Sequence, residues 1–164
     1  MEEHNARILD HATLLKVIEH TPLVAIDLIV RNARGEVLVG WRTNRPAKDC
    51  WFVPGGRICK DERRAAAYAR ISYGELGTAL PLAEATFRGA YEHHYDENFA
   101  GRPGISTHYI VLAYEIRLET ALADLPQAQH SRYRWLSVTD LLEASDVHPN
   151  TKAYFSADQD DLSE

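Results

Sequence analysis

The stretch from Trp51 to Thr78 places the strongest constraint on the fold of this chain. It reads as a short apolar strand, a Pro-Gly-Gly turn, a charged loop and a helix. Asp61 and Glu62 favour a helix N-terminus, and Gly77 offers a C-terminal stop. The two glycines of the turn let the backbone turn tightly and approach a ligand without side-chain obstruction. Such a turn beside a carboxylate-bearing helix suits a metal ion and a phosphate, and it equally suits an ordinary strand-to-helix connection.

The residue spacing in this stretch resembles the Nudix hydrolase signature, G-x5-E-x7-R-E-U-x-E-E-x-G-U, where U is a bulky aliphatic residue. Five positions match at the required spacing, and these are Gly56, Glu62, Arg70, Glu75 and Gly77. Four positions depart from it: Ile71 and Gly74 stand where the signature has glutamates, and Ser72 and Thr78 replace aliphatic residues. The resemblance implies an α/β Nudix fold, in which a mixed β-sheet is sandwiched between α-helices.

The helix that carries the signature has lost most of its carboxylates. At about 100° per residue, positions 71, 74 and 75 share one helix face, and only Glu75 is acidic there. A hard cation such as Mg²⁺ requires oxygen ligands and often keeps its waters while it bridges phosphates. One carboxylate, a turn carbonyl and one further oxygen can hold one ion but not a cluster. If the chain is an enzyme, its general base must come from outside this helix.

One branch of the Nudix family shows the same pattern, because it keeps the form Arg-x-x-x-x-Glu-Leu-Gly and lacks the other glutamates. This branch hydrolyses GDP-mannose, and its resemblance to the chain extends from about residue 12 to residue 155. The matching segments are Thr21–Val24, Trp41–Ala47, Trp51–Arg57, Tyr95–Phe99, Thr107–Tyr109, Gln129–His130 and Tyr133–Leu136.

The resemblance to the GDP-mannose mannosyl hydrolases implies a metal site and a catalytic base. Gln129, Glu75 and the carbonyl of Gly55 would hold one Mg²⁺, for which Mn²⁺ substitutes. His130 would be the base, since an imidazole has a pKa suited to that task near neutrality. Arg57 would act with the metal to neutralise charge on the leaving diphosphate. A lone histidine in a loop is otherwise an ordinary surface residue, so the role of His130 depends on this resemblance and on the missing helix carboxylates.

The same resemblance implies five substrate contacts, some of which have structural alternatives. Asp27 interrupts an apolar strand, where an ionised carboxylate is costly unless it is paired, so it contacts sugar hydroxyls or has a structural partner. Arg42 ends a strand and suits a diphosphate through its bidentate fork, or it is a solvated surface residue. His93 matches a position near the sugar, and Tyr109 reaches the ligand or joins the core. Arg57 would point toward the phosphate oxygens beside the metal.

The implied reaction is hydrolysis of a nucleotide sugar, with GDP-mannose as first choice and GDP-glucose next. Water would attack the anomeric carbon and break the C–O bond, which gives GDP and a sugar of inverted configuration, in the manner of an inverting glycosidase. Two alternatives remain. One is a Nudix pyrophosphohydrolase that attacks phosphorus, and the other is a catalytically silent regulator that binds nucleotide sugars.

The N-terminal segment, residues 1–20, is expected to pack on the domain or on a dimer partner. His11–Glu19 is predicted to form a short amphipathic helix. The family's nucleotide site receives aromatic residues from this region, partly across a homodimer, and Ile8 and Leu14 stand at those positions here. An aliphatic side chain covers a purine face but lacks aromatic stacking, which puts the guanine preference in question.

Composition limits the classes of partner. A chain of 164 residues with 45% apolar content fits one domain with a sizeable core, the Nudix domain of residues 21–157, followed by an acidic tail at 158–164. The net charge of −6 argues against binding to nucleic acid or to an anionic membrane surface. Cys50 and Cys59 do not make a disulfide framework. With no signal-peptide pattern and no membrane-length apolar run, the expected location is the cytoplasm.

Strand and helix patterns along the rest of the chain predict a hairpin, two longer strands and small C-terminal helices. The loop after Tyr95 contains glycine and proline and suits a mobile rim over a ligand. His93 and His94 are adjacent on a strand and should face opposite sides. The predicted strands are Leu23–Arg31, Glu36–Arg42, Phe87–Tyr95, Thr107–Leu118 and Tyr133–Val138, followed by a helix Thr139–Ala144 capped by Thr139 and a last helical turn within Asn150–Ala157.

Overall fold

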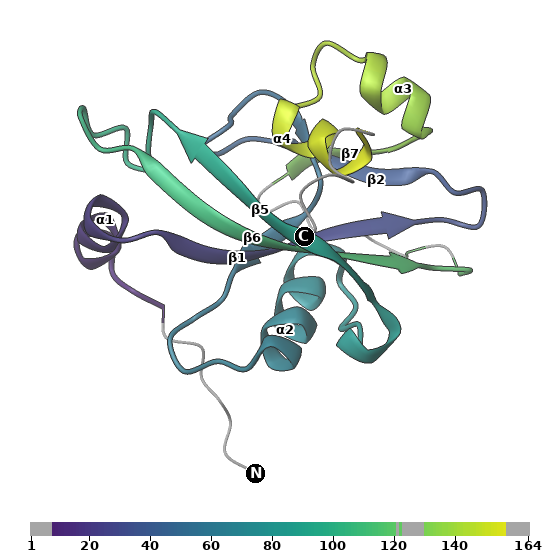
Figure 1. Cartoon of the computed structure of the whole chain (residues 1–164), viewed down its shortest axis with the longest axis horizontal. Coiled ribbons are helices and arrows are strands. Elements are labelled where there is room, and N and C mark those ends of the chain that lie inside the picture. The colour runs from purple at the N-terminus through teal and green to yellow at the C-terminus, as the bar shows by residue number, and fades with distance from the viewer. Residues whose placement is uncertain (1–7, 121, 123–129, 157–164) are drawn as a thin grey trace.

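The computed structural model describes residues 8–120, 122 and 130–156 (Figure 1). Helices and strands alternate irregularly along the chain. In order they are α1 (His11–His20), β1 (Leu23–Arg31), β2 (Val37–Arg42), β3 (Trp51–Phe52), β4 (Gly55–Arg57), α2 (Arg64–Leu76), η1 (Leu82–Glu84), β5 (Thr86–Tyr95), β6 (Thr107–Arg117), β7 (His130–Leu136), α3 (Val138–Glu143), α4 (Pro149–Lys152) and η2 (Ala153–Phe155).

The strands form one mixed sheet with β1 at its centre. The main path runs β3-β2-β1-β6-β5, while β4 pairs with β1 and β7 pairs with β2. β1 and β6 run parallel over their whole shared length, and the other pairs are antiparallel. β1 therefore contacts three strands, and its continuous apolar run is typical of a strand with both faces covered.

Helices cover both faces of the sheet, as predicted (Figure 1). On one face α2 packs through Tyr68, Ile71 and Leu76 against apolar side chains of β1 and β6. On the other face the short C-terminal helices contribute Leu141 and Tyr154 to a second core. The predicted α/β architecture, a mixed sheet between helices, is confirmed. No helix among the described residues is long and apolar enough to cross a membrane.

Helix α2 ends where predicted but begins later. Gly77 adopts the left-handed conformation (φ 75°) and its N–H bonds to the Tyr73 carbonyl, so the expected glycine stop is confirmed. The expectation that Asp61 and Glu62 open the helix is wrong, because α2 begins at Arg64 and its first turn holds no acidic residue. Asp61 lies in the left-handed region (φ 66°), which is incompatible with a helix.

The Pro-Gly-Gly segment is a short strand rather than a tight turn. Gly55 pairs with Asp27 as part of β4, and neither Gly55 nor Gly56 has a positive φ. Close packing makes glycine necessary here. A Cβ atom on Gly55 would overlap Asp27 Oδ1 and lie 2.7 Å from the Ile26 carbonyl oxygen, and one on Gly56 would lie 3.1 Å from Ile71. The two glycines thus let β4 fit between β1 and α2.

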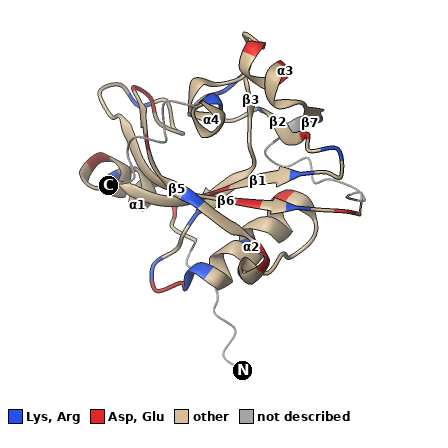
Figure 2. Ribbon diagram, turned by 45° about the vertical axis from the view of Figure 1, so that its right-hand side comes forward, with Lys and Arg blue, Asp and Glu red and all other residues tan. Residues whose placement is uncertain are grey.

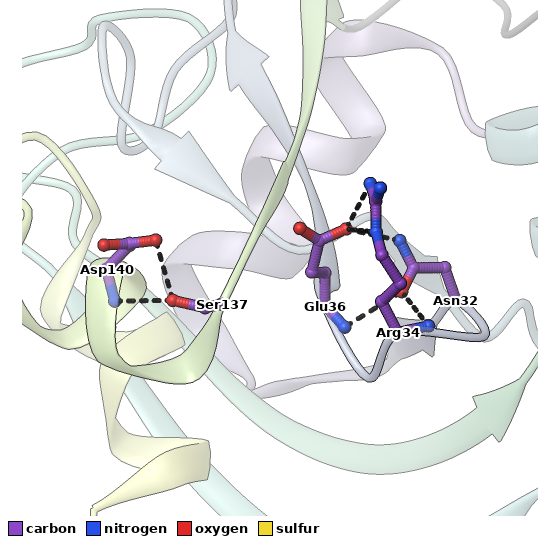
Figure 3. Close-up of polar contacts among 5 residues, drawn as sticks. All are labelled: Asn32, Arg34, Glu36, Ser137 and Asp140. Carbon is purple, nitrogen blue, oxygen red and sulfur yellow. Dashed lines mark hydrogen bonds and ion pairs between the residues drawn. The ribbon is translucent and has the colours of Figure 1, made fainter.

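Side-chain hydrogen bonds set the turn between β1 and β2 (Figure 3). Asn32 Oδ1 accepts from the backbone N–H groups of Arg34 and Glu36 at 3.0 Å, and Asn32 Nδ2 donates to Glu36 Oε2. Gly35 completes the turn with φ 79°. Side chain and backbone together fix the predicted hairpin.

Helix α3 is capped by Ser137, so the prediction that Thr139 caps it is wrong. Ser137 Oγ accepts from the Asp140 N–H at 3.1 Å and donates to Asp140 Oδ2 at 2.7 Å (Figure 3). The helix therefore starts one residue before Thr139, at Val138. Serine is as good an N-cap as threonine, and the position of the first helical residue decides between them.

The remaining elements agree closely with the sequence predictions. Strands β1, β5 and β6 match to within one residue at each end, whereas β7 begins earlier, at His130. His93 is buried and His94 is exposed, which confirms that they face opposite sides of β5. Basic and acidic residues are spread over several elements (Figure 2). Residues 158–164, the predicted acidic tail, lie outside the described residues.

Candidate functional site

An open cavity of about 740 Å³ lies at one end of the sheet. Its walls come from α1, β1, β5 and β6, from the segment between β2 and β4, and from the loop after β5. The lining residues are His11, Leu14, Ile18, Leu23, Ala25, Asp27, Arg42, Thr43, Asn44, Arg45, Pro46, Lys48, Phe52, Val53, Gly55, Gly56, Arg57, His93, Tyr95, Phe99, Thr107, Tyr109 and Val111.

The cavity brings together six of the residues singled out from the sequence. All five expected substrate contacts line it, together with the expected metal ligand Gly55; the five are Asp27, Arg42, Arg57, His93 and Tyr109. These residues come from five strands, β1, β2, β4, β5 and β6, so the fold assembles them.

The described lining is rich in cations although the chain is acidic overall. Arg42, Arg45, Lys48 and Arg57 carry positive charge, and Asp27 is the one carboxylate among the described lining residues. Such a local excess of cations attracts an anionic ligand. The arginine forks among them match the oxygens of a phosphate or diphosphate.

Arg42 is the central cation of the cavity. It is the last residue of β2, and its guanidinium carbon lies 5.6 Å from the ring centre of Phe52. Burial raises the pKa of Asp27 and of Tyr109, and the charge of Arg42 partly opposes both shifts, so its field reaches both β1 and β6. The Nε of Arg42 is buried and finds no hydrogen-bond acceptor among the described residues. Arg42 as a whole is half-buried, so it is only partly solvated, and its contact with a diphosphate stays a prediction.

Asp27 is a buried carboxyl at the floor of the cavity. Its side chain accepts a hydrogen bond from the hydroxyl of Tyr154 at 2.5 Å. Burial raises the pKa of Asp27 from 3.8 to about 7, although the Tyr154 hydrogen bond and the charge of Arg42 act in the opposite direction. Asp27 therefore has a structural partner and also lines the cavity, and its contact with sugar hydroxyls stays a prediction.

His93 and Tyr109 stand opposite each other on β5 and β6. Burial lowers the pKa of His93 to about 4, so its ring is neutral at physiological pH. Burial also raises the pKa of Tyr109, which keeps its hydroxyl protonated. Neutral imidazole and phenol groups both donate and accept hydrogen bonds, as sugar hydroxyls require.

Glu75 is the buried carboxylate of α2, with 6% of its surface exposed, and it does not line the cavity. It lies near the floor, since its charge raises the pKa of Asp27. Among the described residues, no three His, Cys, Asp or Glu side chains converge to hold a metal ion. Carboxylate and carbonyl oxygens are the hard donors that Mg²⁺ and Mn²⁺ accept, and the roles of Glu75 and Gly55 as ligands stay predictions. Gln129, the third expected ligand, lies outside the described residues.

The backbone of His130 lies within the structure at the first position of β7. It pairs with Arg42 across an irregular register between Gly40 and Arg42 of β2. His130 is thus a strand residue rather than a loop residue, and its backbone lies beside the strand end that presents Arg42 to the cavity. The orientation of its side chain is outside what the structure describes.

Two residues of the signature, Glu62 and Arg70, brace the segment that carries Arg57. Arg70 contacts both carboxylate oxygens of Glu62, at 2.6 and 2.9 Å, and donates to the Arg57 carbonyl at 2.8 Å. Glu62 also accepts from the Cys59 N–H at 2.9 Å. This bidentate pair fixes the start of the loop after β4, which places Arg57 at the cavity wall.

The rim of the cavity is formed by the loops after β2 and β5, which are joined by a side-chain contact. Arg45 lies 3.6 Å from Glu97, and Glu97 also accepts from the Ala47 N–H. The second loop is built around Asn98, which is fully buried and makes four hydrogen bonds within residues 98–105. Closure of this rim over a ligand stays a prediction.

Sequence reasoning missed several residues of this region. Tyr154 and His148 come from the last described helices, which carried no motif of their own. The ring centres of His148 and Phe52 lie 5.1 Å apart, and Asn150 Nδ2 donates to the Tyr95 hydroxyl at 3.2 Å. Ile8 and Leu14 stand where the resembling family has aromatic residues. Leu14 lines the cavity from α1, whereas Ile8 is 93% exposed.

A model of the NUDIX domain matches residues 21–158. This chain belongs to the NUDIX domain family. Family membership and fold together support a Nudix hydrolase as the class of protein. The matched range also covers the expected domain, although its precise limits and the separate N-terminal and tail segments stay predictions.

Relatives and solved structures agree with this assignment. The low-salt glycan biosynthesis protein Agl8 of Haloferax volcanii is 33% identical over 142 residues, which are 86% of this chain and 85% of that protein. The MutT protein of Methanosarcina mazei superimposes with a TM-score of 0.65 at 18% identity, over 83% of this chain and 92% of that one. The NUDIX domain of Shewanella oneidensis NrtR, complexed with ADP ribose, superimposes with a TM-score of 0.61 at 16% identity. The match covers 90% of this chain and 97% of that one. These likenesses confirm the predicted Nudix fold.

Proposed function

We propose that this chain is a Mg²⁺-dependent Nudix hydrolase that splits a nucleoside diphosphate sugar, with GDP-mannose as the first candidate and GDP-glucose as the next. Water attacks the anomeric carbon, and the bond from that carbon to the diphosphate oxygen breaks. The electron pair of this bond leaves with GDP. The products are GDP and a free sugar of inverted configuration.

The observation that carries the proposal is the mixed lining of one cavity. Arg42 and Arg57 suit a diphosphate, whereas Asp27, His93 and Tyr109 suit the hydroxyls of a sugar. A ligand with both an anionic and a hydroxyl-rich part uses all five groups. A nucleoside diphosphate has no second sugar on its terminal phosphate and uses fewer of these groups.

Helix α2 supplies a single carboxylate, that of Glu75, whereas a cluster of helix carboxylates would hold several metal ions. Glu75, the Gly55 carbonyl and Gln129 would hold one Mg²⁺, which would supply positive charge at the leaving diphosphate. Arg42 and Arg57 hold the same diphosphate and add positive charge there. Mn²⁺ substitutes because it accepts the same oxygen donors.

His130 accepts the proton of the attacking water. Its backbone position opposite Arg42 supports this role, because it brings the residue to the strand end that presents the diphosphate ligand. An imidazole of ordinary pKa is suited to base catalysis near neutrality. The printed name of the Haloferax relative, a glycan biosynthesis protein, agrees with a sugar-containing substrate. The active form in this proposal is a homodimer, which light scattering of the purified chain tests.

Hydrolysis in ¹⁸O-labelled water tests the proposed bond cleavage. Purified protein is incubated with Mg²⁺ and a panel of nucleotide sugars, and the products are identified by mass and NMR. The proposal requires label in the sugar and inversion at its anomeric carbon. Label in a phosphate product establishes a pyrophosphohydrolase instead, and binding without turnover establishes a nucleotide-sugar-binding regulator.

A further inference from the structure

Tyr154 is a buried residue of η2, with 5% of its surface exposed. The segment before it is anchored to the strands beside the cavity. The N–H of His148 donates to the Trp51 carbonyl at 3.0 Å, and the N–H of Val53 donates to Thr151 Oγ1 at 3.3 Å. The ring of Tyr154 packs edge-on against Tyr91 of β5, with 4.7 Å between ring centres. These contacts hold the Tyr154 hydroxyl in one place.

This hydroxyl contacts two residues that line the cavity. It donates to Asp27 Oδ2 at 2.5 Å and lies 3.3 Å from His93 Nε2. Asp27 belongs to β1 and His93 to β5, and β6 runs between those two strands. Strands two places apart in a sheet are separated by about 10 Å. A third side chain is therefore needed to join these two, and Tyr154 provides it from the helical layer.

Tyr154 and Gly55 together determine how the Asp27 carboxyl is oriented. Oδ2 accepts the Tyr154 hydrogen bond, and Oδ1 lies where a side chain on residue 55 would be. A phenylalanine at position 154 would fill nearly the same volume but would leave Oδ2 without this donor. A buried carboxyl that loses its donor rotates or recruits another partner, because leaving it unsatisfied is costly.

We propose that Tyr154 is a positioning residue for the sugar-binding end of the cavity, where it holds Asp27 and His93 in the orientation that binds sugar hydroxyls. The inference rests on the proposed function only in that the ligand is a nucleotide sugar. It does not depend on which bond is cleaved. Tyr154 acts through Asp27 and His93, since its own hydroxyl is already used by them.

Ligand binding separates this role from a merely structural one. The parent for the experiment is His130→Gln, in which GDP-mannose persists, and calorimetry measures its Kd and that of GDP with Mg²⁺ present. Tyr154→Phe should weaken GDP-mannose binding about 10-fold, the value of one hydrogen bond to a charged or polar group, and change the Kd of GDP less than about 2-fold. When Asp27→Asn is already present, adding Tyr154→Phe should change the Kd of GDP-mannose little further.

Tyr68→Phe is the matched control, because Tyr68 is also buried but its hydroxyl has no hydrogen-bond partner among the described residues. It should leave both Kd values unchanged. Three results would each overturn the inference. Tyr154→Phe could weaken the binding of GDP and of GDP-mannose equally, it could weaken the binding of neither, or its effect on the Kd of GDP-mannose could add fully to that of Asp27→Asn. A parent that binds neither ligand overturns the inference and the nucleotide-sugar proposal together. If label from ¹⁸O-water enters phosphate while the binding pattern holds, only the proposed bond cleavage fails.

Discussion

The backbone of His130 pairs with the backbone of Arg42 where β7 meets the end of β2. Gly40 pairs with Tyr133 in the same ladder, so one residue lies between the paired positions on β2 and two lie between those on β7. The pairing is therefore irregular between Gly40 and Arg42. Irregularities of this kind re-aim side chains and are common beside active sites. The residue proposed as base and the main cavity arginine are thus placed by one local feature of the sheet.

Replacement of His130 tests its proposed role directly. His130→Gln should lower kcat by about 10²–10⁴, because general base catalysis contributes that much, and the thermal unfolding midpoint should stay close to that of the wild type. His94→Gln is the control, since His94 is exposed on the outer side of β5. Turnover of His130→Gln at nearly the wild-type rate would remove His130 from the mechanism.

Replacement of Glu75 tests the metal site. Glu75→Gln keeps the size of the side chain but removes its charge, so half-maximal activity should need at least about 10-fold more Mg²⁺, the loss typical even of outer partners of a metal site. Glu92→Gln on the exposed side of β5 is the control. An unchanged Mg²⁺ titration for Glu75→Gln would reject this residue as a ligand.

Much of the fold was predictable because local signals and tertiary packing agree. The run from Leu23 to Arg31 is apolar enough to specify a buried strand, and Gly77 specifies a helix end. The start of α2 was mispredicted because Asp61 adopts the left-handed conformation, and Glu62 is instead used as the ion-pair partner of Arg70. The role of Gly55 was misjudged for a related reason, since its neighbour is Asp27, which lies far away in sequence.

The candidate site was predictable wherever a motif marks it. Arg42, Asp27 and His93 were found from the resemblance, and the structure places them around one cavity. Tyr154 carries no such mark, because an aromatic residue in a short C-terminal helix is ordinarily part of the core. Its importance comes from a contact across 127 positions of sequence, which periodicity and propensity cannot indicate.

Two glycines provide a matched test of packing against helix propensity. Gly55→Ala should destabilise the protein by about 1–3 kcal/mol, because the added Cβ would overlap the Asp27 side chain in a close-packed region. Gly74→Ala should stabilise it by about 0.5–1 kcal/mol, because Gly74 lies within α2 and a Cβ there meets nothing within 4 Å. Urea unfolding measures both. A neutral Gly55→Ala would mean that β4 and Asp27 can separate at little cost.

Two buried groups should give the folded state opposite responses to pH. The pKa of His93 is lowered from 6.5 to about 4, so its contribution to stability is lost as pH falls through that range. The pKa of Asp27 is raised from 3.8 to about 7, so its contribution is lost as pH rises through that range. Between about pH 4 and 6.5 the folded chain keeps a proton on Asp27 and lacks one on His93, and the two effects oppose each other.

Removing one of these groups should reveal the other. In Asp27→Asn the effect of His93 is no longer offset, so the unfolding free energy should fall more steeply than in the wild type as pH is lowered from 6.5. The extra slope should be about 1.4 kcal/mol per pH unit, which corresponds to one proton. Urea unfolding of both proteins at a series of pH values measures it. Parallel pH profiles for the two proteins would show that Asp27 is already ionised in the folded wild type over this pH range.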